Sequence, residues 1–203
     1  MIFMDSGQEK RYSKFKAINN DEFQEIVKTS LNTRKGRYFA NNEYKHYKSF
    51  SESILKDTQN RREKGILFNK NGDILLVKLG TKSAIKFSDE EKALFNGNKF
   101  IHNHPSGNGL SSADVSLAVH SGLQEVVAVS SNQMYRLVLK SNLDLREIMV
   151  EYYKSQRKVS SLFQIMHATG KVTEGQLSKE FDHFVLSVFS KSTKGVNYES
   201  KRY

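Results

Sequence analysis

The only proline of the chain, Pro105, directly follows two histidines at alternate positions in the stretch KFIHNHP. Residues two apart on a β-strand point to the same face of the sheet, so a strand here would present the imidazoles of His102 and His104 side by side. Proline cannot donate a hydrogen bond to a neighbouring strand, so we expect the strand to end at this point. The sequence therefore predicts a short strand that delivers two neighbouring imidazoles to one end of the fold.

A pair of imidazoles needs a third ligand to form a zinc site, and Asp114 is the next carboxylate along the chain. The glycines Gly107 and Gly109 allow the intervening loop to turn tightly. Two histidines and one carboxylate leave a fourth position for water, as catalytic zinc sites do. The chain has no cysteine, so any metal site must use His, Asp or Glu. Ser111-x-x-Asp114 is also typical of a helix N-cap, and this interpretation stays open.

The pattern of apolar residues predicts an α/β fold with a mixed central sheet flanked by helices. We expect two hairpins, one over 65–80 around the Asn71-Gly72 turn and one over 125–140 around residues 131–133. Helices are expected at 20–32, 41–59, 88–97, 111–123, 142–167 and 174–190, with extended chain before them and a polar tail over the last dozen residues. This divides the chain into an N-terminal helical extension (1–62), a core (63–140) and a C-terminal helical extension (141–203).

The chain carries a net charge of +10, and the excess lies in the two flanks more than in residues 63–140. Basic clusters such as Arg34-Lys35-Gly36-Arg37 and Arg61-Arg62 could bind nucleic-acid phosphates or an acidic protein. No arginine-rich helix or RNA-binding aromatic motif accompanies them, which favours a solvated surface. No apolar run reaches the ~20 residues of a membrane span, and no apolar segment typical of a secretory signal is present. We therefore expect a cytoplasmic protein without membrane contact.

The hexapeptide HNHPSG at 102–107, followed by Ser111-x-x-Asp114, resembles the signature of the JAMM metalloproteases, also called the JAB/MPN family. The resemblance is strongest to the bacterial RadC-like branch of that family. Upstream, Glu63 precedes the predicted hairpin and Gly80-Thr81 follows it, as in family members. The resemblance spans residues 63–140. The loop from His104 to Ser111 is one residue shorter than the family's usual spacing.

The resemblance implies a JAMM or cytidine-deaminase-like fold and a zinc-dependent hydrolase, a metalloprotease or isopeptidase acting on a protein or peptide. In this scheme His102, His104 and Asp114 hold Zn²⁺, Glu63 transfers protons as general base and acid, and Ser111 helps to hold the oxyanion. A nucleobase deaminase is excluded, because its cysteine ligands are absent. Four other histidines have no partner at ligand spacing and are expected to be ordinary, namely His46, His120, His167 and His183.

Two further classes of function stay open beside the hydrolase. The RadC-like resemblance also suggests a DNA-associated accessory protein that binds nucleic acid through its basic flanks. A binding module that keeps the fold without the activity is a third class. The complete set of Glu, two His and Asp argues against this third class, because a scaffold does not need those residues. The sequence does not specify an oligomeric state.

Overall fold

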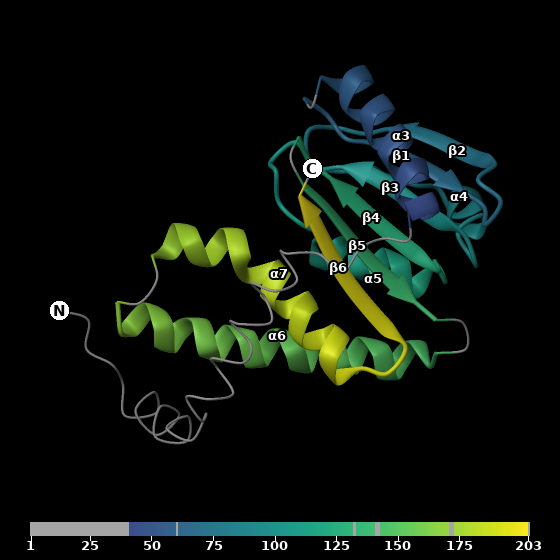
Figure 1. Ribbon diagram of the computed structural model, residues 1–203. Coiled ribbons are helices and arrows are strands. Elements are labelled where there is room, and N and C mark those ends of the chain that lie inside the picture. The colour runs from purple at the N-terminus through teal and green to yellow at the C-terminus, as the bar shows by residue number, and fades with distance from the viewer. Residues whose placement is uncertain (1–40, 60, 132, 141–142, 171–172, 203) are drawn as a thin grey trace.

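The computed structural model describes residues 41–59, 61–131, 133–140, 143–170 and 173–202 of the chain of 203 residues (Figure 1). The helix predicted at 20–32, the extended segment before it and the basic cluster Arg34–Arg37 lie outside the described residues. Among the described helices, none combines the length and the apolar character that a membrane-spanning segment requires.

A six-stranded mixed sheet forms the centre of the fold, with the strand order β2-β1-β3-β4-β5-β6. Strands β3 and β4 pair in parallel, and the other neighbouring strands of this sheet pair antiparallel. The strands are β1 (Lys64–Phe68), β2 (Ile74–Leu79), β3 (Lys99–Asn103), β4 (Glu125–Val129), β5 (Gln133–Leu139) and β6 (Val196–Arg202). The described helices are α3 (Asn41–Thr58), α4 (Asp89–Ala93), α5 (Ser112–His120), α6 (Leu145–Ala168) and α7 (Glu174–Ser192). The predicted α/β architecture with a mixed sheet is confirmed.

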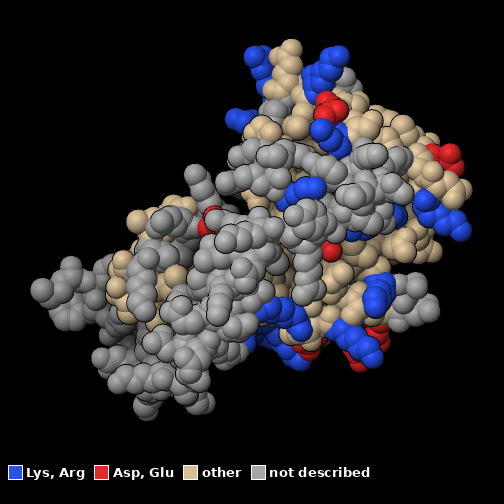
Figure 2. Space-filling model, in the orientation of Figure 1, with Lys and Arg blue, Asp and Glu red and all other residues tan. Residues whose placement is uncertain are grey.

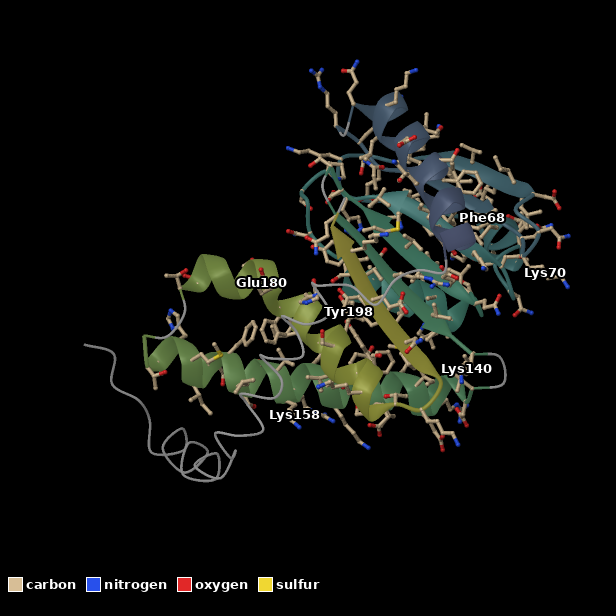
Figure 3. The ribbon with its side chains drawn as sticks, viewed as in Figure 1. Phe68, Lys70, Lys140, Lys158, Glu180 and Tyr198 are labelled. Carbon is tan, nitrogen blue, oxygen red and sulfur yellow. The ribbon has the colours of Figure 1, made fainter. Side chains whose placement is uncertain are left out.

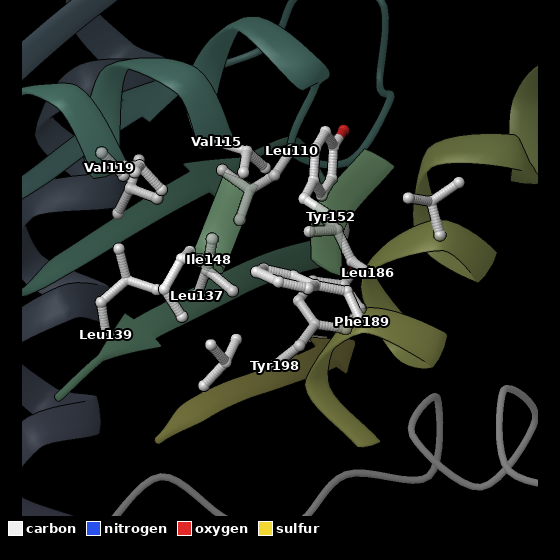
Figure 4. Close-up of a cluster of buried hydrophobic side chains, with 14 of the residues drawn as sticks. Leu110, Val115, Val119, Leu137, Leu139, Ile148, Tyr152, Leu186, Phe189 and Tyr198 are labelled. Atoms are coloured by element: carbon white, nitrogen blue, oxygen red, sulfur yellow. The ribbon is translucent and has the colours of Figure 1, made fainter. Parts of the chain in front are cut away.

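Helix α3 covers one face of the sheet, and helices α5, α6 and α7 cover the other face (Figure 1). Side chains alternate along β3, so Ile101 is buried on the α3 face while Phe100 is buried on the opposite face. The larger core lies on that opposite face and includes Val115 of α5, Tyr152 of α6 and Phe189 of α7 (Figure 4). The ring of His102 stacks on Phe100, at 5.1 Å between ring centroids. The paired histidines therefore face α5, at the end of β3.

The helix predicted at 88–97 is shorter in the structure, where α4 spans five residues and buries none of its own side chains. The helix begins at a capping box, because the Ser88 hydroxyl accepts from the backbone N–H of Glu91 and the Glu91 carboxylate accepts from the N–H of Ser88. The chain then leaves the helix early and places Phe95 in the core, fully buried. Burial of that ring is consistent with an end of the helix before residue 97, where the predicted range ends.

The last residues form strand β6, and the prediction of a polar tail there is wrong. β6 pairs with β5 from Val196 to Arg202. Its burial alternates with a period of two, because Val196, Tyr198 and Ser200 are buried while Asn197 is exposed. The Tyr198 hydroxyl lies 2.9 Å from Nδ1 of His183, which joins β6 to α7 (Figure 3). The sequence pattern did not reveal this strand, because only two of its seven residues are large and apolar.

Candidate metal centre

His102, His104 and Asp114 converge at the end of β3, and each offers one ligand atom within 4.8 Å of the others. The Nε2 atoms of the two histidines lie 2.9 Å apart. Asp114 Oδ1 lies 3.0 Å from His102 Nε2, and Asp114 Oδ2 lies 3.5 Å from His104 Nε2. The structure thus brings the three residues together, even though the loop between His104 and Ser111 is short.

The loop that returns the chain from β3 to α5 begins at Pro105, as the sequence predicts. The N–H of Gly107 donates to the carbonyl of His104 at 3.0 Å, which closes a turn directly after the second histidine. Gly107 has a φ of +77°, a left-handed conformation that favours glycine. At Gly109 an added Cβ would come within 3.2 Å of the Tyr135 ring. Both glycines therefore serve the tight return that brings Asp114 to the imidazoles.

Asp114 is both a helix-capping residue and a member of this cluster. Ser111 is the N-cap of α5, and its hydroxyl accepts from the backbone N–H of Asp114 at 3.3 Å. In return, Asp114 Oδ2 accepts from the N–H and from the hydroxyl of Ser111, each at 2.7 Å. The cap uses Oδ2, so Oδ1 remains directed at His102. The cap and the metal-ligand interpretations are therefore compatible, and the cap orients the carboxylate.

Hydrogen bonding defines which nitrogen of His104 can bind a metal. Its Nδ1 lies 2.8 Å from the carbonyl of Gly109, so Nδ1 carries the proton and Nε2 presents a lone pair. This is the second-shell arrangement that metal-binding histidines usually show. On His102, Nδ1 is buried without a hydrogen-bond partner among the described residues.

The spacing of the three ligand atoms fits a zinc ion. Zn–N bonds of about 2.0–2.1 Å at a tetrahedral angle place ligand atoms roughly 3.3 Å apart. The two histidine nitrogens lie 2.9 Å apart, and each lies 3.0 or 3.5 Å from a different carboxylate oxygen of Asp114, so the separations are of this order. The histidines are 2% and 8% exposed, so the surroundings of the cluster are largely dry. Two imidazoles and one carboxylate in this arrangement suit zinc.

The charges of the cluster depend on one another. Burial alone would lower the pKa of His102, but the Asp114 carboxylate outweighs it and raises that pKa above its ordinary value. Burial and the charge of His102 lower the pKa of His104. Burial would raise the pKa of Asp114, yet His102 and its other partners hold that pKa well below the usual range. These opposite shifts are those expected of an ion pair between His102 and Asp114 beside a neutral His104.

Glu63 lies directly before β1 and is 8% exposed. Burial raises the pKa of its carboxyl, His102 partly offsets that rise, and Asp114 adds to it. Gly65 of β1 pairs with His102 of β3, so Glu63 lies two residues from that pair, beside the end of β3 that carries the histidines. A raised pKa suits a group that accepts and returns a proton near neutral pH. The structure thus brings Glu63 to the same site as the predicted ligands.

Asp182 of α7 is a further acidic group near the cluster, which the sequence analysis did not find. Burial and the Asp114 carboxylate raise the pKa of Asp182. Burial, Asp182 and Asp114 together raise the pKa of the Tyr152 hydroxyl on α6. No local sequence motif marks Asp182 or Tyr152.

The other histidines behave as predicted where the structure describes their side chains. His120 and His167 are exposed at the ends of α5 and α6. His183 is buried against Tyr198 of β6. The side chain of His46 lies outside the described residues.

The Lys and Arg side chains visible in Figure 2 lie in several separate groups on the face in view. Arg61 and Arg62 are exposed directly before Glu63.

A cavity of about 510 Å³ lies away from the metal cluster, near the start of β4, with Lys70 and Lys140 in its lining (Figure 3).

No family model matches the chain, and comparison with curated proteins and with solved structures gives no match. The functional argument therefore depends on the site itself and on the resemblance of its motif to the JAMM signature.

Proposed function

We propose that this protein is a zinc-dependent hydrolase that cleaves a peptide or isopeptide bond. One observation carries the proposal: the Asp114 carboxylate lies 3.0 and 3.5 Å from two imidazole nitrogens, and the buried Glu63 lies two residues before Gly65, which pairs with His102. These groups come from three separate segments, the residue before β1, the end of β3 and the first turn of α5. A helix cap by itself requires no imidazole pair at its carboxylate.

The three ligands and the general base have separate roles in this proposal. His102, His104 and Asp114 would hold the zinc ion. When bound, zinc supplies a Lewis acid that polarises a carbonyl group and lowers the pKa of a water molecule to about 7. The Glu63 carboxylate accepts the proton of the attacking water and returns it to the nitrogen of the leaving amine. Burial raises the pKa of Glu63, which makes its carboxylate a stronger base for the first transfer.

Ser111 has a defined task in the structure and a second one in the proposal. Its hydroxyl donates to Asp114 Oδ2 and thereby fixes the carboxylate. To hold an oxyanion it must turn this hydrogen from Asp114 to the substrate oxygen. The backbone N–H of Ser111 would still bind Oδ2 after that turn. Asp114 therefore keeps one contact that orients it during the reaction.

The choice of a peptide or isopeptide substrate is supported by the resemblance of HNHPSG and Ser111-x-x-Asp114 to the JAMM signature. We also propose that the protein acts in the cytoplasm, because its lack of cysteine fits a reducing compartment. The DNA-associated alternative depends on basic residues of which Arg34–Arg37 lie outside the described part of the chain.

A cleavage assay with defined metal content tests this proposal. The purified chain is stripped with a chelator, reloaded with one equivalent of zinc and incubated with a panel of peptides and isopeptide-linked conjugates. We expect cleavage of at least one substrate by the zinc form and none by the stripped form. Glu63→Gln should bind zinc and lose cleavage at least 100-fold, whereas Glu90→Gln on the exposed side of α4 should cleave normally. A zinc-loaded wild type that leaves the whole panel intact contradicts the proposal.

A further inference from the structure

Asn103 lies between the two histidines in sequence, but its side chain bonds the backbone next to Glu63 instead of joining the cluster with Asp114. It is fully buried. Its Oδ1 accepts from the backbone N–H of Lys64 at 2.7 Å, and its Nδ2 donates to the carbonyl of Arg62 at 3.0 Å. These two backbone groups belong to the residues on either side of Glu63. The Asn103 side chain therefore holds the backbone on both sides of Glu63 by hydrogen bonds.

The backbone of Glu63 is also held from its other side. Its N–H donates to the carbonyl of Thr81 at 2.7 Å, and its carbonyl accepts from the N–H of Gly80 at 2.8 Å. Gly80 and Thr81 directly follow β2, so this pair of bonds continues the antiparallel pairing of β1 with β2. On the β3 side the ladder ends at the pair Gly65–His102. Beyond that pair, the side chain of Asn103 replaces the backbone bonds that a longer strand would make.

Alternation along the strand explains why this residue can reach Glu63. His102 and His104 have their rings on the face that carries α5, and Asn103 between them points the other way. An amide side chain can form both bonds, because it accepts from the N–H of Lys64 and donates to the carbonyl of Arg62 at the same time. Buried amides without such partners are costly, so full pairing favours one fixed position. The tripeptide His102–His104 thus fixes two ligands and the backbone that carries the base.

We propose that Asn103 is a positioning residue, which holds Glu63 at the distance from the metal ligands that proton transfer requires. This inference rests on the proposed hydrolase function, in which Glu63 moves the proton. A displacement of about 1 Å at a reacting group can lower a rate by about 100-fold. Asn103 does not contact the ligand atoms, so its loss should affect turnover and leave zinc binding intact.

The test compares Asn103→Ala with Ile101→Val, a buried change on the same strand that removes no hydrogen bond. Three quantities are measured on the full chain: zinc affinity, turnover on the substrate that the wild type cleaves, and exchange of the Lys64 amide hydrogen. For Asn103→Ala we expect zinc affinity within about threefold of wild type, kcat lowered about 100-fold with KM little changed, and Lys64 exchange accelerated beyond the loss of global stability. Ile101→Val should change none of these.

Each contrary outcome overturns the proposal. Normal kcat in zinc-loaded Asn103→Ala, or unchanged Lys64 exchange, shows that Asn103 does not hold Glu63. Loss of zinc together with activity shows that it supports the ligands instead. If Asn103→Ala does not fold, Asn103→Leu is used, because it keeps about the same volume and removes both the acceptor for Lys64 and the donor to Arg62. Should the wild type cleave nothing, the hydrolase proposal fails, and Lys64 exchange still decides whether Asn103 holds this backbone.

Discussion

The carboxylate of Asp114 is shared between Ser111, which donates two hydrogen bonds to Oδ2, and His102, whose Nε2 lies 3.0 Å from Oδ1. The helix cap thus uses Oδ2, and Oδ1 is left for His102 or for the proposed metal ion. The orientation of the ligand follows from the fold of the first turn of α5.

Ser111→Ala should therefore weaken zinc binding as well as the helix. The loss of the cap should lower the free energy of unfolding by about 1 kcal/mol, and the loss of the contact that orients Asp114 should lower zinc affinity about tenfold. Ser88→Ala is the matched control, because Ser88 forms the same capping box on α4. Chemical denaturation and zinc titration of both variants measure the effects. Equal zinc affinities of the two variants would show that Ser111 does not orient Asp114.

The ion pair of His102 and Asp114 predicts how the stability of the zinc-free protein depends on pH. The folded pKa of His102 lies above its ordinary value of 6.5, so its contribution is complete below 6.5 and is lost as the pH rises through the folded value. The folded pKa of Asp114 lies below 3.8, so its contribution is present above 3.8 and is lost as the pH falls toward the folded value. The pair therefore stabilises most between these two ordinary values.

Asp114→Asn should remove this stabilisation. Between pH 4 and 6.5 we expect the variant to be about 3 kcal/mol less stable than wild type, because it leaves a buried imidazole without its counter-charge. The difference should shrink at higher pH, where His102 is neutral in both proteins. Urea denaturation across the pH range measures it, with the exposed Asp89→Asn as control. A difference that does not depend on pH would contradict the assigned ion pair.

Asp182 should increase the affinity for a cation without binding it directly. The Asp114 carboxylate raises the pKa of Asp182, so the two negative charges interact. Removing the charge of Asp182 should therefore weaken the negative field at His102, His104 and Asp114. We expect Asp182→Asn to lower zinc affinity by about 1 kcal/mol, roughly fivefold. Glu174→Gln, an exposed acid at the start of the same helix, should have no effect. Zinc titration at low salt measures both, and an unchanged affinity of Asp182→Asn would place its charge too far away to act.

Strand β6 should contribute to stability through its contact with α7. Tyr198→Phe removes the hydroxyl that lies 2.9 Å from His183 and should cost about 1 kcal/mol. Tyr153→Phe on the exposed side of α6 is the control and should cost little. Thermal unfolding of both variants compares them. A loss confined to Tyr153→Phe would contradict the role of β6.

The parts of the structure that the sequence predicts are those with local signals. The turn after Pro105 and the capping pattern of Ser111 and Asp114 depend on residues close together in the chain, so the approach of the carboxylate to the imidazoles could be expected. Glu63 lies far away in sequence, and only the resemblance to a known motif connected it with the site. In the structure, the pairing of β1 with β3 brings Glu63 near the histidines of β3.

The features that the sequence did not reveal depend on packing between distant segments. The Asp114 carboxylate affects the pKa of Asp182, and Leu186 and Phe189 of the same helix are buried in the main core, which orients α7. Strand β6 has few apolar residues, and its position is determined by the edge that β5 offers. Asn103 has no signal of its own, since its role depends on which backbone lies opposite it.

Diffraction at the zinc absorption edge from crystals of the zinc-loaded protein tests the central claim most directly. We predict one strong anomalous peak, about 2.0–2.2 Å from His102 Nε2, His104 Nε2 and a carboxylate oxygen of Asp114. Absence of a peak among these three residues in crystals grown with zinc, or a peak that Asp114 does not contact, would contradict the account.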